Sequence, residues 1–127
     1  MHENDIAKHI VAAAYKIHTA LGPGLLELVY ETVLVYELRQ RGLEVTRQAP
    51  ISVVYEKISF DEGFRADLLV QGKVMVELKS VEKVAPVHKK QLLTYLRLAD
   101  MRLGLLINFG EALIKDGITR VVNRLLE

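Results

Sequence analysis

Residues 64–79 read FRADLLVQGKVMVELK, two strand-like runs joined by Gln71-Gly72. Apolar runs of this length on either side of a glycine predict a β-hairpin. The first run contains Asp67, and the second ends with Glu77 and Lys79. Two carboxylates on one face of a sheet can hold Mg²⁺ through oxygen ligands, and a neighbouring ammonium can orient a water or neutralise charge developing on a phosphate. These residues are therefore candidates for one site of metal-dependent phosphodiester cleavage.

The length of the hairpin loop decides whether the two carboxylates meet. Side chains alternate between the faces of a strand, so a two-residue turn at Gln71-Gly72 would place Asp67 and Glu77 on opposite faces. A three-residue loop over 70–72, with Gly72 in the left-handed conformation, would place them on the same face. They would then be diagonal neighbours, roughly 7 Å apart at Cβ. The metal hypothesis thus predicts a loop with an odd number of residues.

Composition limits the kinds of protein that fit. A chain of 127 residues with 50% hydrophobic content predicts a single folded domain over 1–127. No apolar run approaches the roughly 20 residues of a membrane span, and the start Met-His-Glu-Asn-Asp lacks the features of a signal peptide. We therefore expect a cytoplasmic protein that does not associate with a membrane.

Residue types also restrict the chemistry. The absence of cysteine excludes thiol nucleophiles and cysteine-bound metal centres, so a metal must be held by oxygen or histidine. The four histidines show no metal-binding spacing. A formal net charge of +1 gives no argument for nucleic-acid binding from bulk charge.

Periodicity along the chain predicts the order of the elements. Helical spacing and turn signals indicate two helices, then several strands that include the hairpin, then a third helix and a buried strand. Their expected ranges are 4–21 and 25–41 for the first helices, 44–48 and 51–55 for the early strands, 86–99 for the third helix and 103–109 for the last strand. Residues 118–126 fit both a helix and a strand. A hairpin followed by a crossover helix implies a mixed sheet in an α/β arrangement.

Two predicted helices carry further candidate residues. On the second helix, Leu26, Val29, Val33 and Leu38 lie near one face. Glu27 lies within the apolar stretch 25–29, where a buried carboxylate needs a partner or a metal, although a solvent-facing position is an equal alternative. Gln91 and Tyr95 are four apart and align on the third helix. Their amide and phenol could hold the lysine or a phosphate, or could cap the edge of the core.

Six segments together resemble a known family. They are GLLELVY (24–30), DEGFRAD (61–67), VELK (76–79), APVH (85–88), QLLTYL (91–96) and LLINF (105–109). These segments are similar to the GxxExxY proteins, which are grouped with the PD-(D/E)xK nuclease superfamily, and the resemblance spans almost the whole chain. It implies a restriction-endonuclease-like α/β core of helix, three strands, helix and strand. The mixed β-sheet would be flanked by helices, with an additional N-terminal helix.

The resemblance also implies roles for individual residues. Asp67, Glu77 and Glu27 would hold Mg²⁺ or Mn²⁺, and Lys79 would position the attacking water or stabilise the pentacovalent phosphate. Gln91 and Tyr95 look like the glutamine-x-x-x-tyrosine element of the exonuclease-like branch. One departure is Ala66, which stands where the superfamily name has proline. That position shapes the strand, whereas Asp67 supplies the chemistry.

The leading hypothesis is therefore a metal-dependent nuclease that hydrolyses phosphodiester bonds in DNA or RNA. The alternative is a catalytically inert nuclease-fold module that binds nucleic acid or a protein partner. Because the chain is small, a homo-oligomer or a protein partner could supply the rest of a binding surface. A small-molecule enzyme with a Mg²⁺ site is a third hypothesis, but no pocket motif supports it.

Overall fold

The computed structural model describes residues 1–126, apart from the side chain of Glu62. These residues form three α-helices, five strands and one short 3-10 helix, and from α2 onward their order of helix, three strands, helix and strand agrees with the expected core. The elements are α1 (Glu3–Leu21), α2 (Glu27–Gln40), β1 (Val45–Tyr55), β2 (Ile58–Val70), β3 (Val74–Lys79), α3 (Pro86–Ala99), β4 (Leu103–Asn108), η1 (Ile114–Gly117) and β5 (Ile118–Val122).

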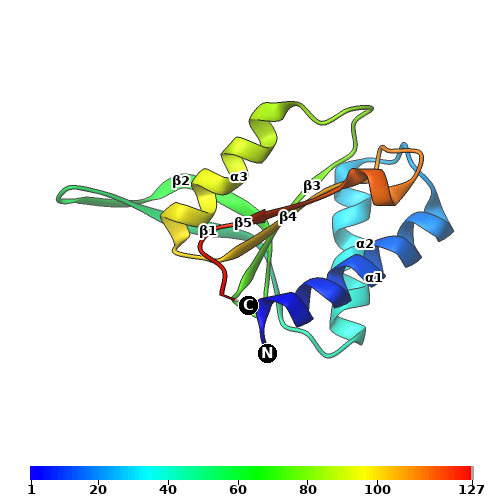
Figure 1. Ribbon diagram of the computed structural model, residues 1–127, viewed down its shortest axis with the longest axis horizontal. Coiled ribbons are helices and arrows are strands. Elements are labelled where there is room, and N and C mark those ends of the chain that lie inside the picture. Colours follow the sequence, from blue (N-terminus) through cyan, green and yellow to red (C-terminus); the bar gives the residue numbers. More distant parts are fainter. Residues whose placement is uncertain (127) are drawn as a thin grey trace.

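The five strands form one mixed sheet between two layers of helices. Their spatial order follows the chain, β1-β2-β3-β4-β5. All neighbours are antiparallel except β3 and β4, which run parallel because α3 crosses over between them. In Figure 1, α3 covers one face of the sheet, and α1 and α2 lie together on the other. The mixed sheet and its crossover helix are as expected.

Each face of the sheet has its own hydrophobic cluster. The larger cluster packs α1 and α2 against the sheet and includes Tyr30, Leu34 and Val76. The smaller cluster packs α3 against the opposite face and includes Met75, Leu92, Leu96, Leu106 and Val121. Val74, Val76 and Leu78 thus face the larger cluster, and Met75 faces α3. By alternation, Glu77 and Lys79 belong to the α3 side of β3.

The β2–β3 hairpin has the odd loop that the metal hypothesis requires. Its last pairs are Val70 with Val74 and, further from the loop, Leu68 with Val76. The loop therefore consists of Gln71, Gly72 and Lys73, one residue later than expected, and Gly72 has φ +64°. Because of this shift, the positions after the final pair are Asp67 and Glu77. The register therefore aligns the two acids directly rather than diagonally, at the point where β2 leaves β3.

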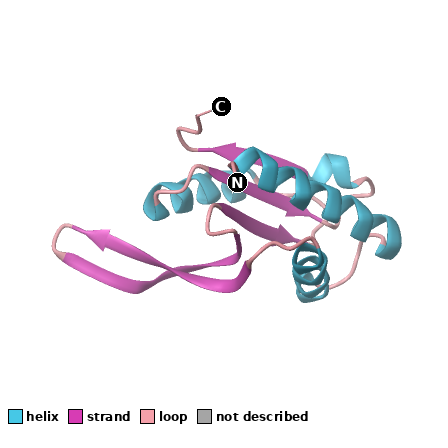
Figure 2. Cartoon of the chain, turned by 90° about the horizontal axis from the view of Figure 1, so that it is seen from below, coloured by secondary structure: helices cyan, strands magenta, loops and turns pink. Residues whose placement is uncertain are grey.

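Strand β2 separates from β3 at Asp67 and continues with β1 as a long arm. The β2–β3 pairing ends at Leu68, whereas the β1–β2 pairing reaches Tyr55 and Ile58 at the tip. Figure 2 shows this two-stranded arm extending away from the rest of the protein. The expectation of two short strands separated by Ala49-Pro50 was wrong, because both residues lie within the continuous β1.

The structure corrects the predicted buried face of α2 and decides the state of residues 118–122. The predicted apolar face of α2 was displaced, because Leu26 is 76% exposed and the buried residues are Tyr30, Glu31, Leu34, Val35 and Leu38. Residues 118–122 form the edge strand β5, which pairs with β4. Among the described residues, no helix has the length and apolarity needed to cross a membrane.

Candidate active site

Asp67 lies where β2 leaves β3, and hydrogen bonds fix its carboxylate. Its Oδ2 accepts the backbone N–H of Leu78 at 2.8 Å, in the place where a strand partner would otherwise bind. Its Oδ1 accepts a longer bond of 3.4 Å from the Gln48 amide. The side chain is half-buried. The separation of the two strands therefore leaves a carboxylate at the boundary between the sheet and solvent.

Glu77 is a half-buried acid beside Asp67. Burial raises the pKa of the Glu77 carboxyl from its usual 4.5 to about 8, and the negative charge of Asp67 acts in the same direction. Lys79 opposes this effect and lowers the pKa. Within residues 1–126, Glu77 Oε1 is buried and accepts no hydrogen bond. Ionising both of these neighbouring carboxylates costs free energy through like-charge repulsion, unless a cation lies between them.

The lysine and the third helix also reach this position. Lys79 is half-buried at the end of β3 and is close enough to Glu77 to change its pKa. Burial and the charge of Glu77 raise the pKa of the Tyr95 phenol, and a hydrogen bond with Gln91 lowers it. Tyr95 also stacks on Phe64 of β2, with ring centroids 3.7 Å apart and planes 11° from parallel. Asp67, Glu77, Lys79, Gln91 and Tyr95 thus form one neighbourhood.

Glu27 stands at the edge of the same region. It is the first residue of α2 and is exposed, so the solvent-facing alternative is the one that the structure shows. Glu27 and Asp67 nevertheless line one cleft of about 240 Å³ between α2 and the strands. Tyr30, three residues later, is fully buried, and its hydroxyl donates to the Gly22 carbonyl and accepts from the Leu25 N–H. Tyr30 therefore fixes the loop that leads into Glu27.

The loop after Lys79 is held by a buried asparagine. The Asn108 side chain accepts from the N–H groups of Val81 and Gly110 and donates to the Val81 carbonyl, at 2.9–3.0 Å. Ser80 donates to the Leu25 carbonyl in the loop before α2. These contacts join the end of β3 to β4 and to the start of α2, so Lys79 and Glu27 are held by one connected framework.

Sequence reasoning missed a second acid of α2. Glu31 is 5% exposed and lines the same cleft as Asp67. Arg47 donates to its Oε2 at 2.8 Å, and Gln48 donates to its Oε1 at 2.7 Å. The missed signal was its spacing, because Glu31 lies three and seven residues before Leu34 and Leu38, on the face that is buried.

The donor set suits a divalent cation. Asp67 and Glu77 supply oxygen ligands, which Mg²⁺ and Mn²⁺ prefer, and the buried Glu77 Oε1 has no hydrogen bond to lose. Among residues 1–126, however, no group of three or more acidic or histidine side chains lies close enough to hold an ion. The pair of carboxylates would therefore provide the protein ligands, with water completing the coordination. Glu27 would join only after moving towards Asp67.

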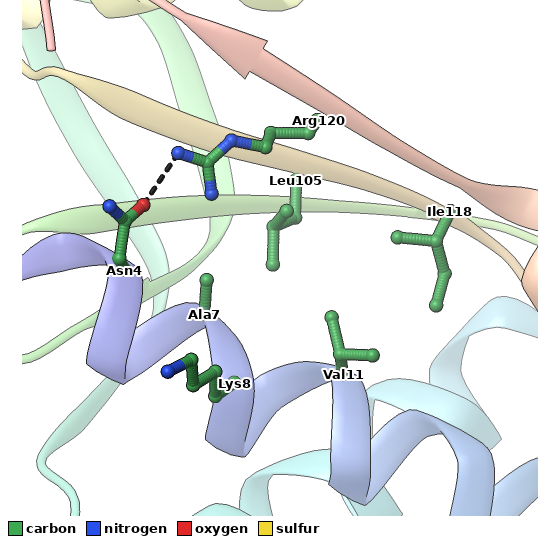
Figure 3. Close-up of a pocket in the computed structure, with 7 residues that line it drawn as sticks. All are labelled: Asn4, Ala7, Lys8, Val11, Leu105, Ile118 and Arg120. Carbon is green, nitrogen blue, oxygen red and sulfur yellow. Dashed lines mark hydrogen bonds between the residues drawn. The ribbon is translucent and has the colours of Figure 1, made fainter. Parts of the chain in front are cut away.

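A larger cavity lies elsewhere and lacks this chemistry. Figure 3 shows the groove of about 530 Å³ between α1 and strands β4 and β5. Its lining is mostly apolar, and its polar groups are Asn4, Lys8 and Arg120, with Arg120 donating a hydrogen bond to Asn4. Among the described residues, no carboxylate lines this groove, whereas Glu27, Glu31 and Asp67 line the smaller cleft.

Comparison with known proteins places this arrangement in a family. Neither the curated proteins nor the solved structures gave a match to the chain. The family model described as the PD-(D/E)XK nuclease superfamily matches residues 4–121, which include every element that contributes to the site. The superfamily to which the sequence resemblance pointed is thereby confirmed. The chain belongs to the PD-(D/E)XK nuclease superfamily.

Proposed function

We propose that the protein is a metal-dependent nuclease that hydrolyses phosphodiester bonds in DNA or RNA. The observation that carries the proposal is the carboxylate pair of Asp67 and Glu77. In this pair the buried Oε1 of Glu77 accepts no hydrogen bond, and the pKa of the Glu77 carboxyl is raised to about 8. A divalent cation would satisfy that oxygen and balance both charges. Membership of a nuclease superfamily supports the same conclusion.

Asp67 and Glu77 would hold Mg²⁺ or Mn²⁺, with Glu27 available at the edge of the cleft. The bound ion would polarise the phosphate and lower the pKa of a water molecule. Lys79, beside Glu77, would orient the attacking water or neutralise charge that develops on the phosphate. Gln91 and Tyr95 would hold the lysine or a non-reacting phosphate oxygen through their amide and phenol groups.

The test combines metal binding with cleavage. Mn²⁺ is titrated calorimetrically into the wild type and into Asp67→Ala, and both are assayed on single- and double-stranded DNA and RNA. We expect Asp67→Ala to lose Mn²⁺ binding and cleavage, and Lys79→Ala to lose cleavage while still binding Mn²⁺. Circular dichroism checks that the variants fold. Asp61→Ala is the matched control, because Asp61 is an exposed aspartate on the same strand.

The result also separates the two main hypotheses. Cleavage that persists in both Asp67→Ala and Lys79→Ala would rule out this site. A folded wild type that binds no Mn²⁺, even with nucleic acid present, would favour the inert module. In that case, binding of nucleic acid or of a protein would be its function.

A further inference from the structure

Gln48 has an unusual backbone for its position in β1. Its neighbours Arg47 and Ala49 pair with Leu68 and Ala66 of β2, but the pairing skips Gln48 and Asp67. Gln48 has φ +47°, a left-handed conformation that L residues other than glycine, asparagine and aspartate seldom adopt. Arg65 donates to its carbonyl at 3.1 Å, which helps to hold the backbone in this state. A strained conformation of this kind calls for a compensating role.

The Gln48 side chain connects two carboxylates. Its Nε2 donates to Glu31 Oε1 at 2.7 Å and to Asp67 Oδ1 at 3.4 Å. The bond to Glu31 has ordinary length, and the bond to Asp67 is long. One amide nitrogen carries two hydrogens, so it can serve both acceptors. The backbone conformation of Gln48 thus places its amide between α2 and the metal-binding pair.

Glu31 is firmly held. It is 5% exposed, and its Oε2 accepts from both Nε and Nη2 of Arg47 at 3.1 and 2.8 Å. Its other oxygen is taken by Gln48. A buried carboxylate with both oxygens bonded is costly to move, because each oxygen would lose a charge-assisted bond. Glu31 is therefore a fixed point to which the Gln48 amide is attached.

The orientation of Asp67 follows from these contacts. One of its oxygens bonds to β3 through the Leu78 N–H, and the other bonds to the Gln48 amide. Each carboxylate oxygen can accept more than one bond, so both retain the capacity to bind a cation. The plane of the carboxylate is thus set before any ion arrives.

We propose that Glu31 is a positioning residue, which orients Asp67 for metal binding through the amide of Gln48. This inference rests on the proposed function. Outer contacts that hold a metal-binding carboxylate commonly raise metal affinity, because less order must be created on binding. The Glu31–Arg47 ion pair also joins α2 to β1, so a purely structural role is the competing explanation.

The substitution Gln48→Gly separates the two roles. It removes the amide, which leaves Glu31 Oε1 without its donor, and it also relieves the left-handed backbone. The loss of the bond lowers the unfolding midpoint and the relief of strain raises it, so we expect a folded variant with only a small net change. We expect its Mn²⁺ affinity to fall roughly tenfold or more. Gln71→Gly is the matched control, because Gln71 has φ +55° and its side chain accepts a hydrogen bond from the backbone N–H of Glu44, away from Asp67 and Glu77. Gln71→Gly should bind Mn²⁺ like the wild type.

A second pair of variants tests Glu31 itself. Glu31→Gln replaces an acceptor of the Arg47 bonds by an amide, and we expect weaker Mn²⁺ binding. Glu37→Gln is its control on α2, because Glu37 pairs with Lys16 instead. In metal-free protein, hydrogen exchange of the Leu78 amide should become faster in Gln48→Gly and Glu31→Gln, because the carboxylate that accepts its hydrogen bond is less well held. Neither control should change this rate.

Each outcome has a definite meaning. The positioning role would be overturned if Gln48→Gly folds, binds Mn²⁺ as tightly as the wild type and exchanges its Leu78 amide at the wild-type rate. The proposed function would then remain intact. Equal losses in Gln48→Gly and Gln71→Gly would also overturn it, because the effect would then be general. A folded wild type that binds no Mn²⁺ would overturn the proposed function and this inference together. If Glu31→Gln does not fold, Gln48→Gly decides the question.

Discussion

The Glu77 carboxyl makes the stability of the metal-free protein depend on pH. Its pKa is about 8 in the folded protein and 4.5 in ordinary surroundings, so the folded state binds this proton more tightly. The free energy of unfolding should therefore fall as pH rises from about 4.5 to about 8, by at most roughly 1.4 kcal/mol per pH unit. Denaturant titrations in a chelator across this range measure the slope.

The same titrations on Glu77→Gln provide the control. A glutamine cannot ionise, so the decline between these pH values should be shallower and the variant should gain stability relative to the wild type at pH 8. Added Mn²⁺ should raise the stability of the wild type more at pH 8 than at pH 6, because fewer Glu77 carboxyls carry a proton that the ion must displace. Identical slopes for the wild type and Glu77→Gln would refute the raised pKa.

At the scale of residues, the sequence revealed those charged residues that interrupt a clear pattern. Asp67, Glu77 and Lys79 stand out because they occur together on the two runs of one predicted hairpin, and the structure brings them together. Glu31 did not stand out, because a glutamate on a helix is ordinary until the buried face is known. The role of Gln48 depends on its positive φ, and no local sequence feature predicts that angle for a glutamine.

The loop between α1 and α2 depends on one hydroxyl group. The buried Tyr30 hydroxyl bonds to Gly22 and Leu25, and its ring stacks on Phe109 with centroids 4.4 Å apart. Tyr30→Phe keeps the ring and leaves two backbone groups without a partner. We expect a loss of about 1–3 kcal/mol in the free energy of unfolding. Chemical denaturation measures it, and a loss no larger than that of Tyr36→Phe, at an exposed position on the same helix, would contradict the expectation.

At the scale of elements, periodicity and turn residues predicted most of the order. The third helix begins at Pro86 and ends at Ala99 as expected, because proline suits a first turn and the apolar spacing is clear. The metal hypothesis predicted an odd β2–β3 loop, but the glycine alone did not fix which three residues form it. Residues 118–122 were ambiguous because Ile, Thr and Val suit a strand while their spacing also fits a helix, and pairing with β4 decides in favour of the strand.

At the scale of the whole molecule, the β1–β2 arm should be the least protected part of the sheet. Val54, Tyr55 and Ile58 near its tip are each more than 60% exposed. A two-stranded hairpin without a packed face is only marginally stable in water. Hydrogen exchange should therefore be much faster for the amides of residues 53–60 than for those of β3 and β4.

Mass spectrometry of peptides from exchanged protein can measure this difference in exchange rate between the arm and strands β3 and β4. Exchange in the arm that is as slow as in β3 would contradict the expectation. The sequence could not predict the arm, because 51–55 reads as an ordinary strand. Whether a strand lies on a core or beyond it depends on the distant residues that pack nearby.

The separation of β2 from β3 at Asp67 also has a practical consequence for engineering. Beyond this point the two arm strands pair with each other, and they meet at a turn formed by Glu56 and Lys57. Exposed turns of this kind tolerate insertions well. A fluorophore or an affinity peptide introduced between these two residues would therefore report on the protein without disturbing the acids at the base of the arm.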